Sequence, residues 1–171
     1  MADLPTTSER QRLIDRLRRG KDRRSIGEAD QIAADAMADT DVLDALVGLM
    51  SHSDPGVAMR AADALEKATR ERASALNRHA DVLLAMIASI EQQEVRWHLA
   101  PLVARLELGS AQAEQVATQL EDYLDDDSQI VRVNTLQALT DIAGDHPVLL
   151  EGVTELVSHH HNQGGPAVRA R

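Results

Sequence analysis

A motif that recurs at nearly constant intervals constrains the fold of this chain more than any other feature. The stretch from Val57 to Ala68 (VAMRAADALEKA) has counterparts beginning at Val95, Val131 and Val168, at intervals of 38, 36 and 37 residues. A period in this range is typical of arrays of helical hairpins, in which each unit buries its apolar face only against its neighbours. We therefore expect an all-α fold, a right-handed solenoid of about four hairpins.

Apolar residues at helical spacing indicate that each repeat is a pair of helices. One face of the first helix would be formed by residues 15, 11 and 8 positions before the leading valine. These residues are Val42, Leu46 and Leu49, then Ala80, Leu84 and Ile87, then Val116, Leu120 and Tyr123, and finally Val153, Val157 and His160. Turn signals at Asp54-Pro55, Gly109-Ser110, Asp127-Ser128, Gly144 and Gly164-Gly165-Pro166 separate the helices.

The domain organisation follows from the period and the length. We expect one domain over residues 1–171, with regular repeats over 39–171 and an incomplete last repeat. Residues 1–38 fit the period poorly and are interpreted as a divergent N-terminal cap. In this cap, one helix would open at Ser8 and stop at Gly20, and a second would run from about Ser25 to Ala38.

Composition excludes several classes of protein. The chain has no cysteine, so disulfides, thiolate metal sites and a cysteine nucleophile are ruled out. It has no apolar run long enough for a signal peptide or a membrane span, and we expect a cytoplasmic location. The net charge is −10, although residues 1–24 alone hold eight Lys/Arg against four Asp/Glu. The acidic remainder argues against wholesale nucleic-acid binding.

The motif residues resemble those of the HEAT-repeat family of α-solenoids over roughly residues 41–171. The resemblance rests on Asp54-Pro55-x-Val57, on Ala61, Ala62, Ala64 and Leu65, and on the Val-Arg pairs at 95–96, 131–132 and 168–169, although Ala58 departs from the pattern. It implies that the second helices line a concave, partner-binding side. It also implies inter-repeat structural roles for Arg96, Arg132 and Asp54, and less clearly for Asp127.

On this basis the binding side would be built by the non-core positions of the second helices. They comprise Arg60, Asp63, Lys67, His98, Pro101, Arg105, Asn134, Gln137, Asp141 and Arg171, with Trp97 beside them. The set is interpreted either as a solvated face or as a mildly basic groove for an acidic peptide or protein. Trp97 would anchor a partner or fill a gap between helices. Pro101 removes the helix hydrogen bond to the carbonyl of Trp97.

Three further clusters carry weaker expectations. A metal site at His159-His160-His161 is not expected, because adjacent residues of a helix point in different directions. The acidic run from Glu121 to Asp127 favours a solvated turn. The basic segment (Arg10, Arg12, Arg16, Arg18, Arg19, Lys21, Arg23 and Arg24) could touch an acidic surface or nucleic acid, or could form a cap helix whose Arg stems cover apolar surface.

The sequence therefore predicts a non-enzymatic protein-interaction scaffold with no cofactor. No catalytic motif is recognisable in it. The alternative hypothesis is a HEAT-like nucleic-acid-binding or DNA-repair protein of the glycosylase type. The unfinished helix at Val168 also predicts an open apolar edge that a second copy could cover.

Overall fold

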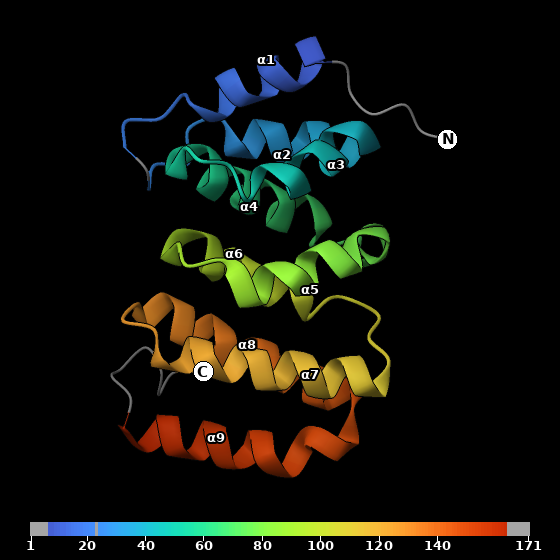
Figure 1. Ribbon diagram of the computed structural model, residues 1–171, viewed down its shortest axis with the longest axis vertical. Coiled ribbons are helices and arrows are strands. Elements are labelled where there is room, and N and C mark those ends of the chain that lie inside the picture. Colours follow the sequence, from blue (N-terminus) through green and yellow to red (C-terminus); the bar gives the residue numbers. More distant parts are fainter. Residues whose placement is uncertain (1–6, 23, 164–171) are drawn as a thin grey trace. The chain divides into compact units, whose positions relative to one another are not determined.

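The computed structural model describes the backbone of residues 7–22 and 24–163, and side chains as far as His160. The described residues form helices and turns, with no strand among them (Figure 1), which confirms the all-α class. The elements are α1 (Thr7–Leu17), α2 (Ala29–Ala38), α3 (Thr40–Leu49), α4 (Pro55–Thr69), η1 (Ala73–His79), α5 (Ala80–Ser89), α6 (Gln93–Val103), α7 (Ser110–Glu121), η2 (Asp122–Asp125), α8 (Gln129–Asp145), η3 (Pro147–Leu149) and α9 (Leu150–Gln163). The repeat fragment at Val168, Arg171, Arg23 and the turn at 164–166 lie outside the described residues.

The chain divides into two compact units, Met1–Val82 and Leu83–Arg171, and each is described by itself. The first unit holds α1 to α4, η1 and the beginning of α5. The second holds the rest of α5 and the elements from α6 to α9. A single continuous domain over residues 1–171 stays a prediction.

Helix α4 is the centre of the first unit. It packs against α1, α2 and α3, and thirteen of its fifteen residues are buried. The helix begins at Pro55 because the Asp54 carboxylate accepts hydrogen bonds from the backbone N–H of Gly56 (2.9 Å) and Val57 (3.4 Å), while proline needs no such partner at the first helical position. Alanine supplies much of α4, so neighbouring helices can approach closely.

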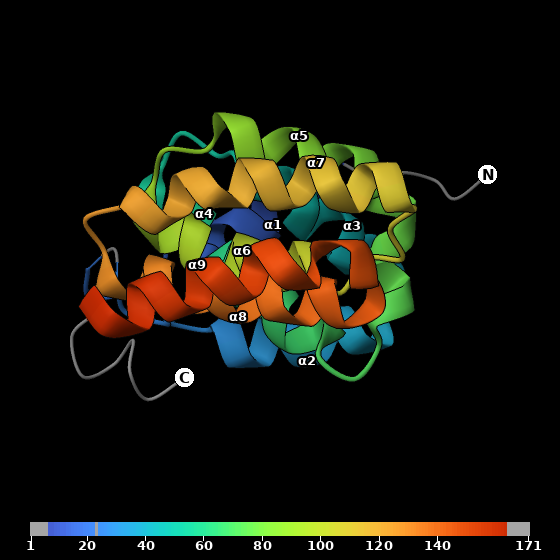
Figure 2. The same ribbon diagram turned by 90° about the horizontal axis from the view of Figure 1, so that it is seen from below.

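The second unit is organised around α8, which packs against α6, α7 and α9. Figure 2 shows α7, α8 and α9 running along one another. Its core is formed by aliphatic side chains together with the single tyrosine; Val95, Leu99, Leu102, Val116, Leu120, Tyr123, Val131, Leu139 and Ile142 are buried. The expected first-helix face is therefore buried at Val116, Leu120 and Tyr123.

Three expected boundaries need correction. The turn predicted at Gly144 is wrong, because α8 continues to Asp145. A single glycine is tolerated within a helix whose neighbours are good helix formers, at a cost of about 1 kcal/mol relative to alanine. The second cap helix begins at Ala29 rather than near Ser25, and the first ends at Leu17 rather than at Gly20. Ser25 and Asp22 instead bond to each other in a turn.

Candidate functional site

Arg60 was expected on an exposed face, and this expectation is wrong: the residue is only 3% exposed. Its guanidinium donates to three backbone carbonyls, those of Leu17 (2.7 Å), Asp22 (2.5 Å) and Ser25 (2.7 Å). These carbonyls belong to the end of α1 and to the loop that follows it, where helix carbonyls lack partners. Arg60 therefore ties this loop to the central helix.

Two glycines make room for this arginine. A Cβ atom at Gly20 would lie 2.0 Å from Nη2 of Arg60, and one at Gly56 would lie 2.8 Å from Nη1. Both are distances at which the guanidinium would have to move. The burial of Arg60 depends on glycines that lie close to it in space, and the sequence alone does not show which glycines these are.

Lys67 lies on α4 but is already paired with two carboxylates. Its Nζ lies 2.8 Å from Asp63 and 2.5 Å from Asp30. Burial alone would lower the pKa of Lys67, but the hydrogen bonds and charges of the two aspartates outweigh it, so the pKa lies above its ordinary value. The lysine charge is balanced within the unit. Asp54, expected in a structural role, caps α4 and also lies 3.6 Å from Arg18.

In the second unit, the structure brings Trp97 of α6 and Asn134 of α8 together. The indole Nε1–H of Trp97 donates to Oγ of Ser128 (2.9 Å), the residue that caps α8. The side-chain amide of Asn134 donates to the carbonyl of Trp97 at 2.7 Å. Because Pro101 has no N–H, the helix cannot supply its usual bond to this carbonyl, and Asn134 takes that place. Trp97 is half-buried, and both its indole N–H and its backbone carbonyl are hydrogen-bonded.

The other residues expected in the groove of this unit are also half-buried. His98 lies on α6, Arg105 lies in the turn that follows α6, and Gln137 lies on α8, where its amide donates to Asp141 at 2.7 Å. Because α6 and α8 pack side by side, these residues come from two adjacent helices and from the turn that ends the first of them. We call Trp97, His98, Arg105, Asn134 and Gln137 the Trp97 surface.

Arg96 and Arg132 converge on Asp126, which is buried. Arg96 Nη1 lies 2.8 Å from the Asp126 carboxylate, and Arg132 Nη1 donates to the Asp126 backbone carbonyl at 2.7 Å. The Arg96 guanidinium also stands over the ring of Tyr123, 4.5 Å from its centre. Asp126, and not Asp127, is thus the acidic partner of the Val-Arg motif in this unit.

Tyr123 completes this cluster. Its hydroxyl donates to the carbonyl of Ile87 at 3.0 Å, which joins η2 to α5. Burial raises the pKa of Tyr123 to about 12, and the positive charge of Arg96 offsets only part of that rise. The phenol therefore stays un-ionised near neutral pH, and its hydrogen bond links the two elements.

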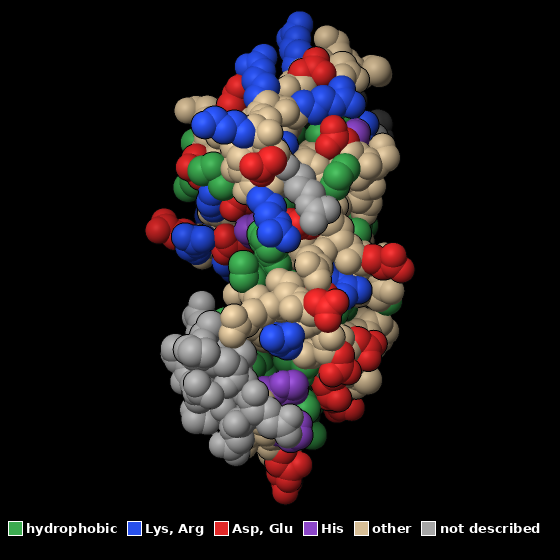
Figure 3. All heavy atoms as spheres, turned by 90° about the vertical axis from the view of Figure 1, so that its left-hand side faces the viewer, with side chains coloured by type: hydrophobic (Ala, Val, Ile, Leu, Met, Phe, Trp, Pro, Cys, Tyr) green, Lys and Arg blue, Asp and Glu red, His purple; other side chains and the backbone are tan. Residues whose placement is uncertain are grey.

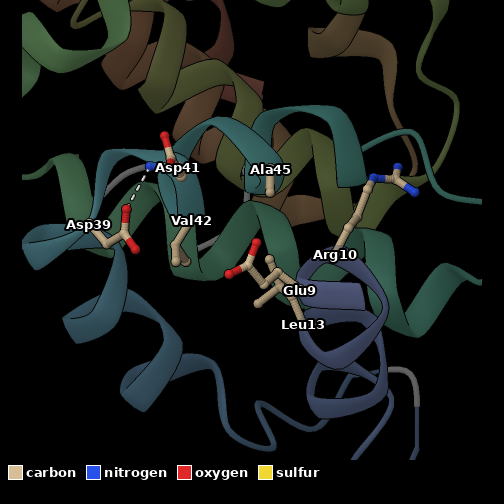
Figure 4. A pocket seen from close by; sticks show the side chains of 7 residues that line it. All are labelled: Glu9, Arg10, Leu13, Asp39, Asp41, Val42 and Ala45. Carbon is tan, nitrogen blue, oxygen red and sulfur yellow. Dashed lines mark hydrogen bonds between the residues drawn. The ribbon is translucent and has the colours of Figure 1, made fainter. Parts of the chain in front are cut away.

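A small pocket in the first unit was not anticipated from the sequence. It has a volume of about 130 Å³ and is lined by Glu9, Arg10 and Leu13 of α1 and by Asp39, Asp41, Val42 and Ala45 at the start of α3 (Figure 4). The Asp39 carboxylate accepts from the backbone N–H of Asp41 at 2.9 Å, so it caps α3. Pockets that hold cofactors usually measure about 300–1,000 Å³, and this one is smaller.

The basic segment of α1 is partly neutralised. Arg16 lies 3.1 Å from Glu28 and 2.7 Å from Asp35, and Arg19 lies 2.8 Å from the same Glu28. Hydrogen bonds from Arg16 and Arg19 lower the pKa of Glu28. Figure 3 shows Lys and Arg side chains gathered at the α1 end of this unit. Arg16 thus ties α1 to Asp35 of α2, and Arg16 and Arg19 share Glu28, the residue that precedes α2.

Within residues 7–22 and 24–160, no group of three or more His, Asp or Glu side chains is placed to hold a metal ion. None of the helices described is both long enough and apolar enough to cross a bilayer. No protein-family model, no curated protein and no solved structure matches this chain. Its function therefore has to be argued from its own residues.

Proposed function

We propose that the chain is a non-enzymatic protein-interaction module built as a HEAT-like, right-handed solenoid. The repeat period of 36 to 38 residues supports this architecture. So do the helical hairpins α3–α4 and α7–α8, together with the side-by-side packing of α2 with α4 and of α6 with α8 inside their respective units. The second helices of successive repeats would form the layer that meets a partner.

The half-buried Trp97 is the observation that carries the proposal. Tryptophan is the residue type most enriched at interface hot spots. Its indole N–H donates to Ser128, and its backbone carbonyl accepts from Asn134. The indole is therefore held before any partner arrives, and less conformational entropy remains to be lost on binding. His98 on the same helix and Arg105 in the turn after it are half-buried polar residues that could add contacts to a partner.

The mildly basic groove expected from the sequence loses two of its cations in the structure. Of the cations counted for a basic groove, Arg60 is buried and Lys67 is paired with two aspartates. Residues 83–163 contain three arginines, no lysine and thirteen Asp/Glu. The acidic second unit therefore gives no charge basis for attracting an acidic peptide or nucleic acid to the Trp97 surface. Binding of nucleic acid by the basic residues of α1 stays a prediction. The proposed partner is a protein that covers Trp97.

The test compares variants of the tagged chain in affinity capture from its native extract, followed by affinity measurement with the captured partner. Trp97→Ala should weaken the complex at least about tenfold, as expected of a hot-spot residue. Gln115→Ala, an exposed position on α7, is the matched control and should bind like the unaltered chain. Equal affinity of the Trp97 variant, with circular dichroism showing it folded, would reject this surface.

A further inference from the structure

An apolar groove lies between α8 and α9 in the second unit. It has a volume of about 190 Å³ and is lined by Thr140 and Ala143 of α8 and by Leu150, Val153, Thr154, Val157 and Ser158 of α9. Leu150 is 48% exposed, and neighbouring Val148 is 68% exposed. We call these seven lining residues the α8–α9 groove. It shares no residue with the Trp97 surface.

Comparison with the other repeats indicates that a helix would fit the groove. Val157 stands at the repeat position of Leu46, Leu84 and Leu120; Leu46 and Leu120 have no exposed surface, whereas Leu84 is half-buried. In the hairpins that hold Leu46 and Leu120, a second helix packs on the first: α4 on α3, and α8 on α7. Val157 is only half-buried. The groove thus has an apolar face of the kind that a helix covers elsewhere in this chain.

The charges around the groove indicate the chemistry of that helix. Asp141 follows Thr140, Glu151 follows Leu150 and Glu155 follows Thr154 in the sequence, and all three carboxylate residues are exposed. One residue further along a helix is about 100° further around it, so these side chains flank the apolar lining on both helices. The same unit has three arginines against thirteen acidic residues among its described positions. A cationic partner is favoured, and an anionic one is repelled.

We propose that the α8–α9 groove is a docking site for an amphipathic helix of a partner protein, with an apolar stripe flanked by Lys and Arg. Helix-in-groove recognition places residues at i, i+3 or i+4, and i+7 into such a groove. The basic flanks would meet Asp141, Glu151 and Glu155. This inference goes beyond the Trp97 surface and does not rest on it.

The experiment uses the full chain and three fluorescein-labelled peptides of about 18 residues, which is about five helical turns. The first has Leu on one helical stripe and Lys elsewhere, the second replaces every Lys by Glu, and the third has the first composition in scrambled order. Fluorescence anisotropy at about 0.15 M salt should show binding of the first peptide alone. Comparable binding of the Glu peptide or of the scrambled peptide would overturn the proposal.

Variants of the chain locate the binding. Leu150→Lys places a charge in the groove and should weaken the first peptide about tenfold or more. Ile130→Lys is the matched control, since Ile130 is 51% exposed, lies at the other end of α8 and adds the same charge. Equal weakening by both variants would mean general charge attraction and would overturn the site. Thr154→Lys provides a second groove variant at an exposed position.

A second copy of the chain is the competing occupant. Sedimentation velocity of the peptide-free chain should show a monomer over the concentrations used for anisotropy. A dimer that Leu150→Lys disperses and Ile130→Lys does not would assign the groove to self-association, and would overturn the proposal of a partner helix.

Discussion

The hydrogen bond between Asn134 and the Trp97 carbonyl should matter only because residue 101 is proline. Asn134→Ala removes the donor that lies 2.7 Å from this carbonyl. The net loss of such a bond is about 1 kcal/mol, and an acceptor left in a partly buried place adds up to about 1 kcal/mol more. We therefore expect Asn134→Ala to lower the free energy of unfolding by about 1–2 kcal/mol.

Pro101→Ala restores the backbone N–H that a helix normally directs to this carbonyl. In that background Asn134→Ala should cost only about 0.5 kcal/mol, because the carbonyl keeps a donor. The difference, about 1 kcal/mol, is the coupling energy of the double-mutant cycle. Whatever Pro101→Ala does by itself cancels from the cycle, including its effect on the unfolded chain.

Urea unfolding of the four proteins, followed by circular dichroism, measures this coupling. Gln137→Ala is the control, since its amide bonds to Asp141 one turn further along the same helix and should show no coupling to Pro101. An equal cost of Asn134→Ala in both backgrounds would refute the reasoning that the amide replaces the missing backbone donor.

Three other changes have predictable effects. Thr135→Val should raise the free energy of unfolding by about 1 kcal/mol, because the buried Thr135 hydroxyl has no partner; a lower urea midpoint would contradict this. Tyr123→Phe should cost about 1 kcal/mol near neutral pH through the lost bond to Ile87. The pKa of Tyr123 is about 12 in the folded chain against an ordinary 10.0, so the unaltered chain loses stability as pH rises from 10.0 to about 12. The difference in unfolding free energy between the unaltered chain and Tyr123→Phe should therefore narrow over this range. A difference that widens would argue against the burial of the phenol. Burial, and then the charge of His159, lower the pKa of His160 below its ordinary 6.5, so the native state loses stability as pH falls below about 6.5. His160→Leu should therefore stabilise the chain more at pH 5 than at pH 8, and urea unfolding that shows an equal gain at both would count against this.

The helical pattern could be predicted where apolar spacing and capping chemistry agree. Asp54-Pro55 marks the beginning of α4 because a carboxylate and a proline satisfy the same unpaired amides. Leu46, Leu120 and Tyr123 are buried as their spacing indicates. Helix ends were less certain, since a lone glycine such as Gly144 can stop a helix or be carried within it.

The roles of the long polar side chains could not be predicted in the same way. Spacing indicates which face of a helix a residue occupies, but it does not show how far a side chain reaches. Arg60 extends from α4 to carbonyls as many as 43 positions earlier in the chain. Asn134 of α8 bonds to the Trp97 carbonyl of α6, which lacks its usual helix donor because residue 101 is proline. Such contacts depend on which helices become neighbours, and that is a property of the fold.

The measurement that tests the central claim most directly is the nuclear magnetic resonance spectrum of the ¹⁵N-labelled chain, titrated with its captured partner. The chain has one tryptophan, so it gives a single indole N–H signal, from the group that bonds to Ser128. If the Trp97 surface is the binding site, this signal should shift in proportion to the fraction bound. An indole signal that stays in place while the complex forms would contradict the account.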